Sequence, residues 1–276
     1  MNLDPASRDR LIADAAALYR PAGRFAYHFA RGKLRGDPLF TTLLRLGAIP
    51  NAGRLVDLGC GQGLLGAWLA VARRGGVDST APRVDAYCGV DQSKSDVARA
   101  RIALPGARIV EADLRSFDVQ ALAPCDVITL FDVLHYLEPA AQQRLLFSAH
   151  AALRDAGTLV LRVGDAAPLS ASRWANAVDL FVCALRGHPR AHLYRRSIHE
   201  WSTLLLDIGF DIEILDDERV DASRRRKRMS FANVLLRATK KFVVPAKAGT
   251  RRLERITTTT LDTRVRGGDV CPTALR

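Results

Sequence analysis

The chain has 276 residues, of which 48% are hydrophobic, and it carries a formal net charge of +12 at pH 7. This hydrophobic fraction is ordinary for a globular protein and is enough to build a sizeable core. The longest apolar runs fall short of the ~20 residues that a membrane-spanning helix needs, and the acidic N-terminal segment lacks the pattern of a signal peptide. We therefore expect a cytoplasmic protein.

The positive charge lies mainly near the C-terminal end. The run 224–228 contributes five positive charges, and residues 246–276 contribute a net four, from seven Lys and Arg against three Asp and Glu. Nucleic-acid binding usually shows as a basic face or stripe, so a basic loop and a basic tail argue against it. We expect residues 242–276, which show no hydrophobic period, to form a disordered tail.

The cysteines are Cys60, Cys88, Cys125, Cys183 and Cys271, and no two of them form a CxxC pair. An odd count without metal-ligand spacing predicts neither a disulfide framework nor a zinc site. We expect reduced, buried side chains and no bound metal.

The first part of the chain is predicted to be helical. Apolar residues at helical spacing predict three helices, over 6–20, 24–34 and 39–46. Ser7 is the expected N-cap of the first helix, and Gly36-Asp37-Pro38 separates the second from the third. We expect residues 1–47 to form a helical lid that also caps the substrate.

From residue 54 onward, short apolar runs alternate with helical stretches. Strands are predicted at 54–58, 84–90, 107–111, 126–131 and 158–163, and helices at 64–72, 93–104 and 139–153. This alternation is typical of βαβ units, so we expect a parallel sheet with helices on both faces.

Beyond residue 165 the alternation changes. Helices are predicted at 169–186 and 197–208, the second ending at Gly209, and strands at 210–215 and 231–236. The Arg-rich run between the two strands is a natural hairpin loop, so an antiparallel pair should close the sheet. Residues 48–241 would then form one α/β domain.

The strongest local signal is a strand that runs into a glycine-rich turn, Val56-Asp57-Leu58-Gly59-Cys60-Gly61-Gln62-Gly63. Glycines let a backbone pass close to a ligand, and the free N–H groups of the following helix can face that ligand. Ligands of open α/β sheets bind at such a place, beyond the carboxyl ends of the strands.

Gly61-Gln62-Gly63-Leu64-Leu65-Gly66 also matches the GxGxxG pattern of dinucleotide-binding dehydrogenases. The match begins after Gly59 has made the turn, and the next strand-end acid, Asp91, lies about 30 residues on rather than about 20. Asp57, inside the strand, has no role in that pattern. These observations leave a dehydrogenase as a distant alternative.

The stretch 56–63 resembles the first motif of class I S-adenosylmethionine (SAM) dependent methyltransferases. Three later stretches resemble the second, third and fourth motifs in order: Gly89-Val90-Asp91, Glu111-Ala112-Asp113-Leu114 and Phe131-Asp132-Val133-Leu134-His135-Tyr136. The resemblance implies SAM as cofactor and a Rossmann-like sheet of seven strands with an antiparallel final strand. It also implies that the second-motif acid binds the ribose hydroxyls and that the third-motif acid accepts from the adenine amino group.

The cofactor-binding residues that this resemblance implies are Asp57, Gly59, Cys60, Gly61, Gly63, Asp91, Gln92, Asp113, Leu114 and Asp132. Carboxylates suit a ligand that is cationic at sulfur. Each acid also has a purely structural interpretation: Asp57 caps the turn, Asp91 caps the next helix, and Asp113 is a surface residue.

Methyl transfer is an in-line displacement, and a phenol or amine acceptor needs a base. The candidate bases are His28, His135 and Tyr136, and we favour His135 because it follows the fourth strand, where the substrate cleft should open. A core histidine bonded to the backbone is the alternative.

Three further groups are weaker candidates. Tyr19, Arg24 and Tyr27 could join His28 in a lid over SAM, or they could pack as ordinary helix residues. Arg162 and Asp165 lie at the end of the fifth predicted strand, and residues 186–188 either touch a substrate or end a helix.

The fourth motif argues against a nucleic-acid substrate. Amino-group methylation of bases typically uses an Asn/Asp-Pro-Pro-aromatic sequence there, and this chain has no proline in Phe131-Asp132-Val133-Leu134. A Pro-Cys nucleophile for carbon-5 methylation would follow the fourth strand, but Pro124-Cys125 precedes it. A small-molecule acceptor is therefore favoured. An RNA methyltransferase that uses the 224–228 loop and a SAM-binding module without catalysis stay as alternatives.

Residues 19–38 are similar to the N-terminus of small methyltransferases of aryl polyene (xanthomonadin-type) pigment pathways, and residues 161–165 and 186–189 look like that group too. The likeness implies O- or C-methylation of a phenolic or aromatic head group in secondary metabolism, with the acceptor held on an acyl carrier protein. Basic residues near the lid would then meet an acidic carrier.

Overall fold

The computed structural model describes residues 4–74, 81–164, 193–215 and 233–242. These residues belong to one compact unit, Met1–Phe242. The helix predicted at 169–186, the Arg-rich loop, Asp165, residues 186–188 and the tail lie outside the described residues.

Seven strands form a single sheet with the order β3-β2-β1-β4-β5-β7-β6. They are β1 (Ala52–Leu58), β2 (Val84–Asp91), β3 (Arg108–Glu111), β4 (Cys125–Phe131), β5 (Leu153–Gly164), β6 (Phe210–Leu215) and β7 (Asn233–Lys240). The first five strands are parallel, and β7 runs antiparallel to both β5 and β6. The predicted fold is confirmed.

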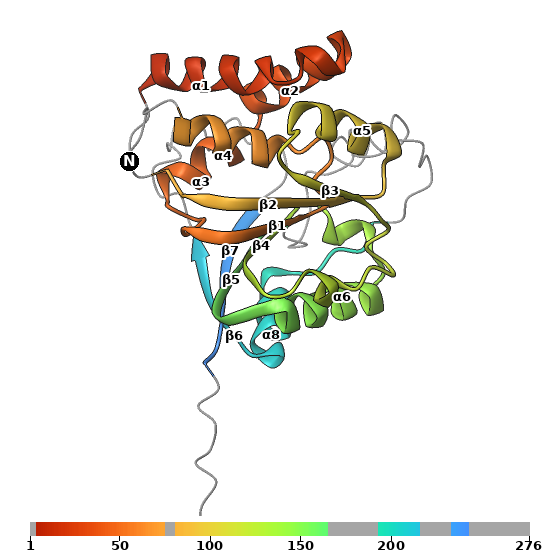
Figure 1. Ribbon diagram of the computed structural model, residues 1–276. Helices are drawn as coiled ribbons and strands as arrows, with labels where there is room; N and C mark the ends of the chain where they lie inside the picture. Colours follow the sequence, from red (N-terminus) through yellow and green to blue (C-terminus); the bar gives the residue numbers. More distant parts are fainter. Residues whose placement is uncertain (1–3, 75–80, 165–192, 216–232, 243–276) are drawn as a thin grey trace, which may run out of the picture. The chain divides into compact units, whose positions relative to one another are not determined.

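Helices cover both faces of this sheet (Figure 1). The α-helices are α1 (Pro5–Ala17), α2 (Arg24–Gly36), α3 (Leu39–Arg45), α4 (Leu64–Arg74), α5 (Lys94–Ala103), α6 (Pro139–Ala152) and α8 (Ile198–Ile208). Short 3₁₀ turns are η1 (Arg20–Ala22), η2 (Val119–Leu122) and η3 (Leu134–Tyr136). Helices α4 and α5 lie on one face, α6 and α8 lie on the other, and α1 packs over α4.

Several predicted boundaries were wrong for local reasons. The N-cap of α1 is Asp4 rather than Ser7, because the Asp4 carboxylate accepts from the backbone N–H groups of Ala6 and Ser7 at 3.0 Å. The last strand continues to Lys240, beyond the predicted end at 236, because it pairs with strands on both sides; the predicted start at 231 lies outside the described residues. By contrast, the predicted stop at Gly209 is confirmed, with φ +108°.

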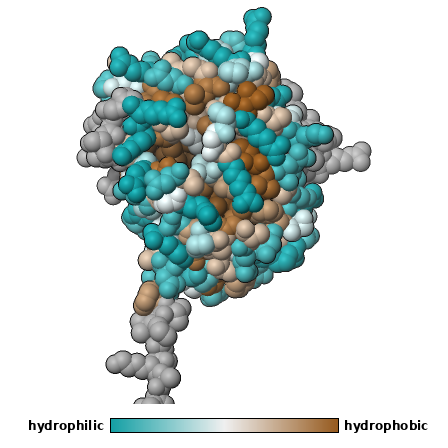
Figure 2. All heavy atoms as spheres, in the orientation of Figure 1, coloured by the Kyte–Doolittle hydropathy of each residue, from teal (hydrophilic) through white to brown (hydrophobic). Residues whose placement is uncertain are grey.

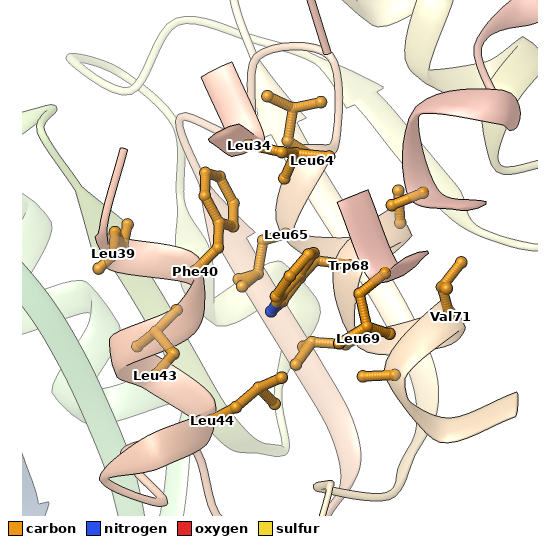
Figure 3. Close-up of a cluster of buried hydrophobic side chains, with 14 of the residues drawn as sticks. Leu34, Leu39, Phe40, Leu43, Leu44, Leu64, Leu65, Trp68, Leu69 and Val71 are labelled. Atoms are coloured by element: carbon orange, nitrogen blue, oxygen red, sulfur yellow. The ribbon is translucent and has the colours of Figure 1, made fainter. Parts of the chain in front are cut away.

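The N-terminal helices share a hydrophobic core with α4. Trp68 is fully buried, and its ring lies edge-on to that of Phe40 at 6.0 Å between centroids (Figure 3). Buried side chains of α1 and α2, such as Leu11 and Leu34, belong to the same cluster. Each fully buried side chain of this size stabilises the fold by roughly 1.5–3 kcal/mol, so residues 5–45 are built into this face of the sheet.

The surface is mixed in character. Figure 2 shows hydrophilic side chains around the rim of one face and apolar ones nearer its middle. Large exposed apolar side chains include Phe25 and Phe147. Within the described residues, the structure contains no helix with the length and apolar character of a membrane span.

Candidate functional site

The order of the strands reverses at β1, with β2 and β3 on one side of it and β4 and β5 on the other. β1 lies between β2 and β4, so its end opens the crevice in which ligands of such sheets bind. Leu58, the last residue of β1, pairs with Val90 and Leu130 on either side. The glycine turn therefore lies level with the residues that follow β2 and β4.

The glycine turn is held tightly against its neighbours. Gly59 has φ +78°, and a Cβ on it would collide with the side chain of Val133. The N–H groups of Gly59 and Cys60 both donate to the Val90 carbonyl, at 2.7 and 3.1 Å. Gly61 has φ +54°, but no atom lies within 4 Å of where its Cβ would be. The turn is thus closed against the sheet at Gly59 and open to solvent at Gly61.

Asp57 lies below this turn and is 4% exposed. Its carboxylate accepts hydrogen bonds from the hydroxyl groups of Tyr87 at 2.6 Å and Thr129 at 2.7 Å. Burial raises the pKa of Asp57 to about 6, although the two hydrogen bonds oppose that rise. Asp57 thus ties β1 to both neighbouring strands beneath the glycine turn, a role close to the structural interpretation of this acid.

Asp91 closes β2 and reaches the turn. One carboxylate oxygen accepts from the Gly61 N–H at 2.8 Å, and the other accepts from the Ser93 N–H at 2.8 Å. The N-cap of α5 is Ser93, whose hydroxyl accepts from the Asp96 N–H, so the alternative of Asp91 as the N-cap is wrong. Each Asp91 oxygen retains lone-pair capacity for a ligand. Gln92, beside it, is exposed.

Asp113 lies two residues beyond the strand partner of Asp91. Glu111 pairs with Asp91 in the sheet, and the Ala112 N–H donates to the Asp91 carbonyl at 3.0 Å. The Asp113 carboxylate accepts hydrogen bonds from the guanidinium of Arg115, and the Asp113 side chain is 36% exposed. Leu114 is buried. The second and third motifs therefore meet at the same edge as the glycine turn.

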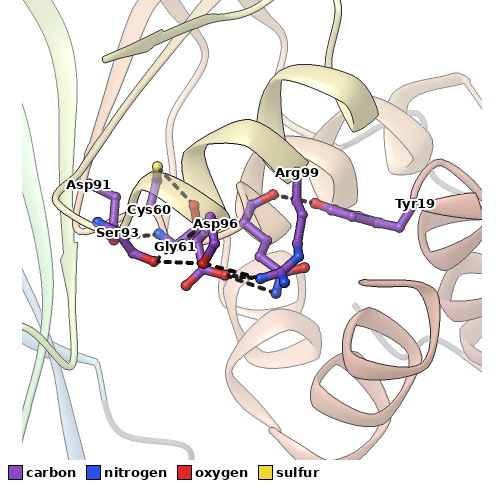
Figure 4. A network of polar contacts seen from close by, with 9 residues as sticks. Tyr19, Cys60, Gly61, Asp91, Ser93, Asp96 and Arg99 are labelled. Atoms are coloured by element: carbon purple, nitrogen blue, oxygen red, sulfur yellow. Dashed lines mark hydrogen bonds and ion pairs between the residues drawn. The ribbon is translucent and has the colours of Figure 1, made fainter. Parts of the chain in front are cut away.

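The glycine turn also carries a polar network that sequence analysis did not predict (Figure 4). The Gln62 side-chain amide donates to Asp96 at 3.1 Å, and Arg99 donates to the same Asp96 oxygen at 2.9 Å. The buried Oε1 of Gln62 has no hydrogen-bond partner among the described residues. An unsatisfied buried acceptor is rare and is expected to meet a ligand or a water molecule.

The cysteine of the turn is not activated. Cys60 is buried and contacts the Gly61 carbonyl at 3.5 Å. Burial raises the pKa of its thiol, and the neighbouring acids Asp57 and Asp91 raise it further. Cys60, Cys88 and Cys125 are all free and buried, which confirms the expectation for these three.

Asp132 follows β4 in a left-handed conformation, with φ +57°. Its carboxylate binds the guanidinium of Arg162 from β5, and Arg162 also binds Asp37, the residue after α2. Sequence analysis included Arg162 as a weak candidate and missed Asp37. The signal for Arg162 was an arginine within the apolar run at the end of β5.

The candidate bases are divided between two regions. His135 and Tyr136 lie in η3, with ring centroids 4.1 Å apart. His135 lines a small pocket together with Arg162 and Trp201. The His135 carbonyl accepts from the Tyr194 N–H at 2.8 Å, so its backbone is fixed. His28 is exposed on α2, where its ring meets Tyr27 edge-on at 5.1 Å.

The other lid candidates have distinct surroundings. Tyr19 is fully buried, and its hydroxyl donates to the Gln62 carbonyl in the glycine turn at 2.9 Å. Tyr27 lies beneath the guanidinium of Arg20, 5.4 Å from its ring centroid, and Arg24 is exposed. Of these residues, Tyr19 is the one that the structure brings to the glycine turn.

The sequence model of the methyltransferase domain matches residues 28–214, more than half of the chain and the whole of the edge just described. The chain belongs to the methyltransferase-domain family. Two curated relatives are carboxy-S-adenosyl-L-methionine synthases. That of Psychrobacter sp. is 33% identical over 118 residues, 40% of each chain, and that of Aliivibrio fischeri is 32% identical over 111 residues, 38% of this chain and 42% of the relative. The match thus spans about two fifths of these curated relatives.

Solved structures show the same fold as this methyltransferase-domain chain. An O-methyltransferase family protein from Burkholderia thailandensis has a TM-score of 0.55 and 16% identity, over 87% of this chain and 64% of the other. A SAM-dependent methyltransferase from Mesorhizobium loti has a TM-score of 0.53 and 21% identity, over 74% of this chain and 96% of the other. The N-terminal domain of EvdMO1, solved with SAH (S-adenosylhomocysteine) bound, has a TM-score of 0.52 and 15% identity, over 74% of this chain and 82% of the other. At these identities the likeness concerns the fold alone.

Proposed function

We propose that this chain transfers the methyl group of SAM to a small-molecule acceptor, a phenolic or aromatic head group that is methylated on oxygen or carbon. The observation that carries the SAM-binding part of this proposal is the hydrogen bond from the Gly61 N–H to the Asp91 carboxylate, at the open point of the glycine turn. Family membership supports methyl transfer as the reaction class.

The residues at this edge fit SAM. Gly61 leaves open the space that a side chain would fill, and Asp91 keeps acceptor capacity for two ribose hydroxyls. The Gln62 Oε1, which has no hydrogen-bond partner in the part of the chain that the structure describes, is a further acceptor in the turn. When bound, SAM supplies an electrophilic methyl group on a sulfonium. The names of the two curated relatives also refer to a SAM derivative, which supports a shared nucleoside-binding part.

The remaining roles follow the positions of the side chains. We assign Asp113 to the adenine amino group and Leu114 to the adenine ring, because both follow β3 beside Asp91. Gly59, Cys60 and Gly63 shape the turn, and Gln92 flanks the ribose site. Asp57 would support the turn from below, and Asp132 would act beside Arg162, which lines the pocket at η3.

The acceptor would meet the methyl donor beside η3. His135 lines a small pocket there and can take the phenolic proton, with the tilted ring of Tyr136 beside it. His28 is the weaker base, since it is exposed on α2. The likeness of residues 19–38 to aryl polyene methyltransferases supports an acceptor held on an acyl carrier protein.

Calorimetry with SAM and SAH tests the proposal directly. We expect Asp91→Ala to weaken both ligands at least tenfold, or about 1.4 kcal/mol, because the ribose acceptor and the anchor of Gly61 are lost together. Asp85→Ala is the matched control, since Asp85 is an exposed acid of the same strand that pairs with Arg83. Absence of SAM binding by the unmodified chain would overturn the function, and unchanged affinity of Asp91→Ala would remove the ribose role.

The acceptor class is tested separately with the unmodified chain. We expect methylation of a simple phenol by labelled SAM, and faster methylation of a 4-hydroxyphenyl thioester on an acyl carrier protein. Equal rates for the free and carrier-bound phenol would count against a carrier partner, and no methylation of either would count against a phenolic acceptor.

A further inference from the structure

One guanidinium joins the N-terminal helices to the site. Arg162 donates to both carboxylate oxygens of Asp37, at 2.6 and 2.7 Å, and its Nε donates to Asp132 at 2.8 Å. A second contact from Arg162 also reaches Asp132. All three guanidinium nitrogens are thus engaged, in the fork geometry that makes arginine–carboxylate pairs strong.

The three side chains differ in burial. The side chains of Asp37 and Arg162 are each 9% exposed, whereas that of Asp132 is 34% exposed. Phe131 pairs with Arg162 in the sheet, and the Asp132 N–H donates to the Arg162 carbonyl at 3.2 Å. Asp132, just after β4, is therefore the member most accessible to a ligand, whereas Asp37 and the guanidinium are buried.

Two positively charged side chains contact Asp37, and only that of Arg162 is buried. Lys33 also contacts Asp37, at 2.9 Å, but its side chain is 44% exposed, so water screens its charge. Burial alone would raise the pKa of Asp37, yet Arg162 and Lys33 hold that pKa well below its usual value. Asp37 is thus a buried anion that competes with Asp132 for one positive charge.

We propose that Asp37 sets the negative charge that Asp132 presents to the cofactor, and that this charge makes the site prefer cationic SAM over SAH, which is neutral at sulfur. Without the Asp37 charge, the whole guanidinium would neutralise Asp132. Asp37 acts through Arg162 and is a positioning residue. This inference rests on the proposed function, because it places the sulfonium near Asp132.

The test compares the dissociation constants of SAM and SAH, measured by calorimetry on the full chain. Asp37→Asn keeps the size of the side chain and removes its charge. We expect SAM to bind about five- to tenfold more weakly and SAH to change less than twofold. Asp9→Asn is the charge-matched control, since Asp9 is an exposed acid of α1 paired with Arg35, and it should move neither constant.

The outcomes separate the inference from the function. If Asp37→Asn weakens SAM and SAH equally, or weakens neither, Asp37 only tethers the N-terminal helices and the inference fails while the proposed function stands. If the unmodified chain binds neither ligand, the proposed function itself fails.

A second variant covers the case in which Asp37→Asn does not fold, as judged by thermal unfolding without ligand. Asp132→Asn removes the more exposed carboxylate, and it should also weaken SAM selectively. An equal loss for SAM and SAH with Asp132→Asn would overturn the inference by itself.

Discussion

The hydroxyl of Tyr19 donates a 2.9 Å hydrogen bond to the backbone carbonyl of Gln62, across 43 residues of sequence. Tyr19 is fully buried, and burial raises the pKa of its hydroxyl well above the usual range, so the group stays protonated and remains a donor. The bond fixes the end of the first helical region to the glycine turn.

Tyr19→Phe removes this donor and leaves a buried carbonyl without it. We expect the free energy of unfolding to fall by about 1 kcal/mol, in line with a lost buried hydrogen bond. SAM affinity should fall about threefold, because the turn loses one of its anchors. Urea unfolding and calorimetry measure the two effects. Tyr27→Phe is the control, since Tyr27 makes ring contacts on α2. A loss of similar size in both variants would show that the Tyr19 bond has no special role.

Gly61 and Gly47 form a matched pair that separates backbone strain from ligand contact. Their φ values are +54° and +55°, and neither has an atom within 4 Å of the position where a Cβ would lie. An alanine in this left-handed region costs roughly 1–2 kcal/mol at either position. Gly47 follows α3, whereas Gly61 is bonded to Asp91.

We expect Gly61→Ala and Gly47→Ala to lower the free energy of unfolding by similar amounts. Only Gly61→Ala should weaken SAM binding, by tenfold or more, because its methyl group enters the open space over the turn. Chemical unfolding and calorimetry on both variants provide the check. If Gly61→Ala bound SAM as tightly as Gly47→Ala, the ligand would not lie over Gly61.

The parts of the fold that were predictable from sequence depend on local pattern. The strand before Gly59 and the end of α8 at Gly209 each follow from residues within a few positions of one another. A parallel sheet closed by an antiparallel pair was predictable because strands alternate with helices up to residue 165 and a hairpin follows.

The contacts that define the site depend on sheet register and on long separations. Tyr87 and Thr129 reach Asp57 across 30 and 72 residues, and Asp37 reaches Arg162 across 125. The signals were present as polar residues in apolar strands and an acid at a helix break. Sequence alone does not pair them, because a shift of one residue in register turns each side chain to the opposite face.

His135 is the favoured base, and its replacement separates catalysis from cofactor binding. We expect His135→Ala to lower kcat for methylation of a simple phenol by about 10²–10⁴-fold, the usual contribution of a general base. The SAM dissociation constant should stay within twofold, because His135 lies in η3 and the proposed ribose and adenine contacts lie after β2 and β3. His150→Ala is the control, since His150 packs against Phe210 and neither residue lines the pocket at η3. An unchanged kcat would assign the proton to another group, with Tyr136 the next to test.

The raised pKa of Asp57 predicts that the free energy of unfolding depends on pH. Burial raises its folded pKa from 3.8 to about 6, so the folded state retains a proton that the unfolded state releases between these values. The stabilising contribution of this proton is complete below about pH 4 and is lost as pH rises through 6. A shift of this size corresponds to about 3 kcal/mol. Asp37, with its lowered pKa, acts in the opposite sense: its contribution is present above about pH 4 and is lost as pH falls further.

At pH 4.5 we therefore expect Asp57→Asn, which cannot ionise, to be no more stable than the unmodified chain. As pH rises to 8, the variant should gain stability relative to the unmodified chain. Urea unfolding at four pH values across this range measures the difference. Thr129→Val should move the transition to higher pH, because Thr129 donates one of the two hydrogen bonds that lower the Asp57 pKa. A constant difference between the Asn variant and the unmodified chain from pH 4.5 to 8 would mean that Asp57 is not proton-linked to folding. The acid would then be ionised throughout, and its hydrogen bonds to Tyr87 and Thr129 would fully compensate its burial.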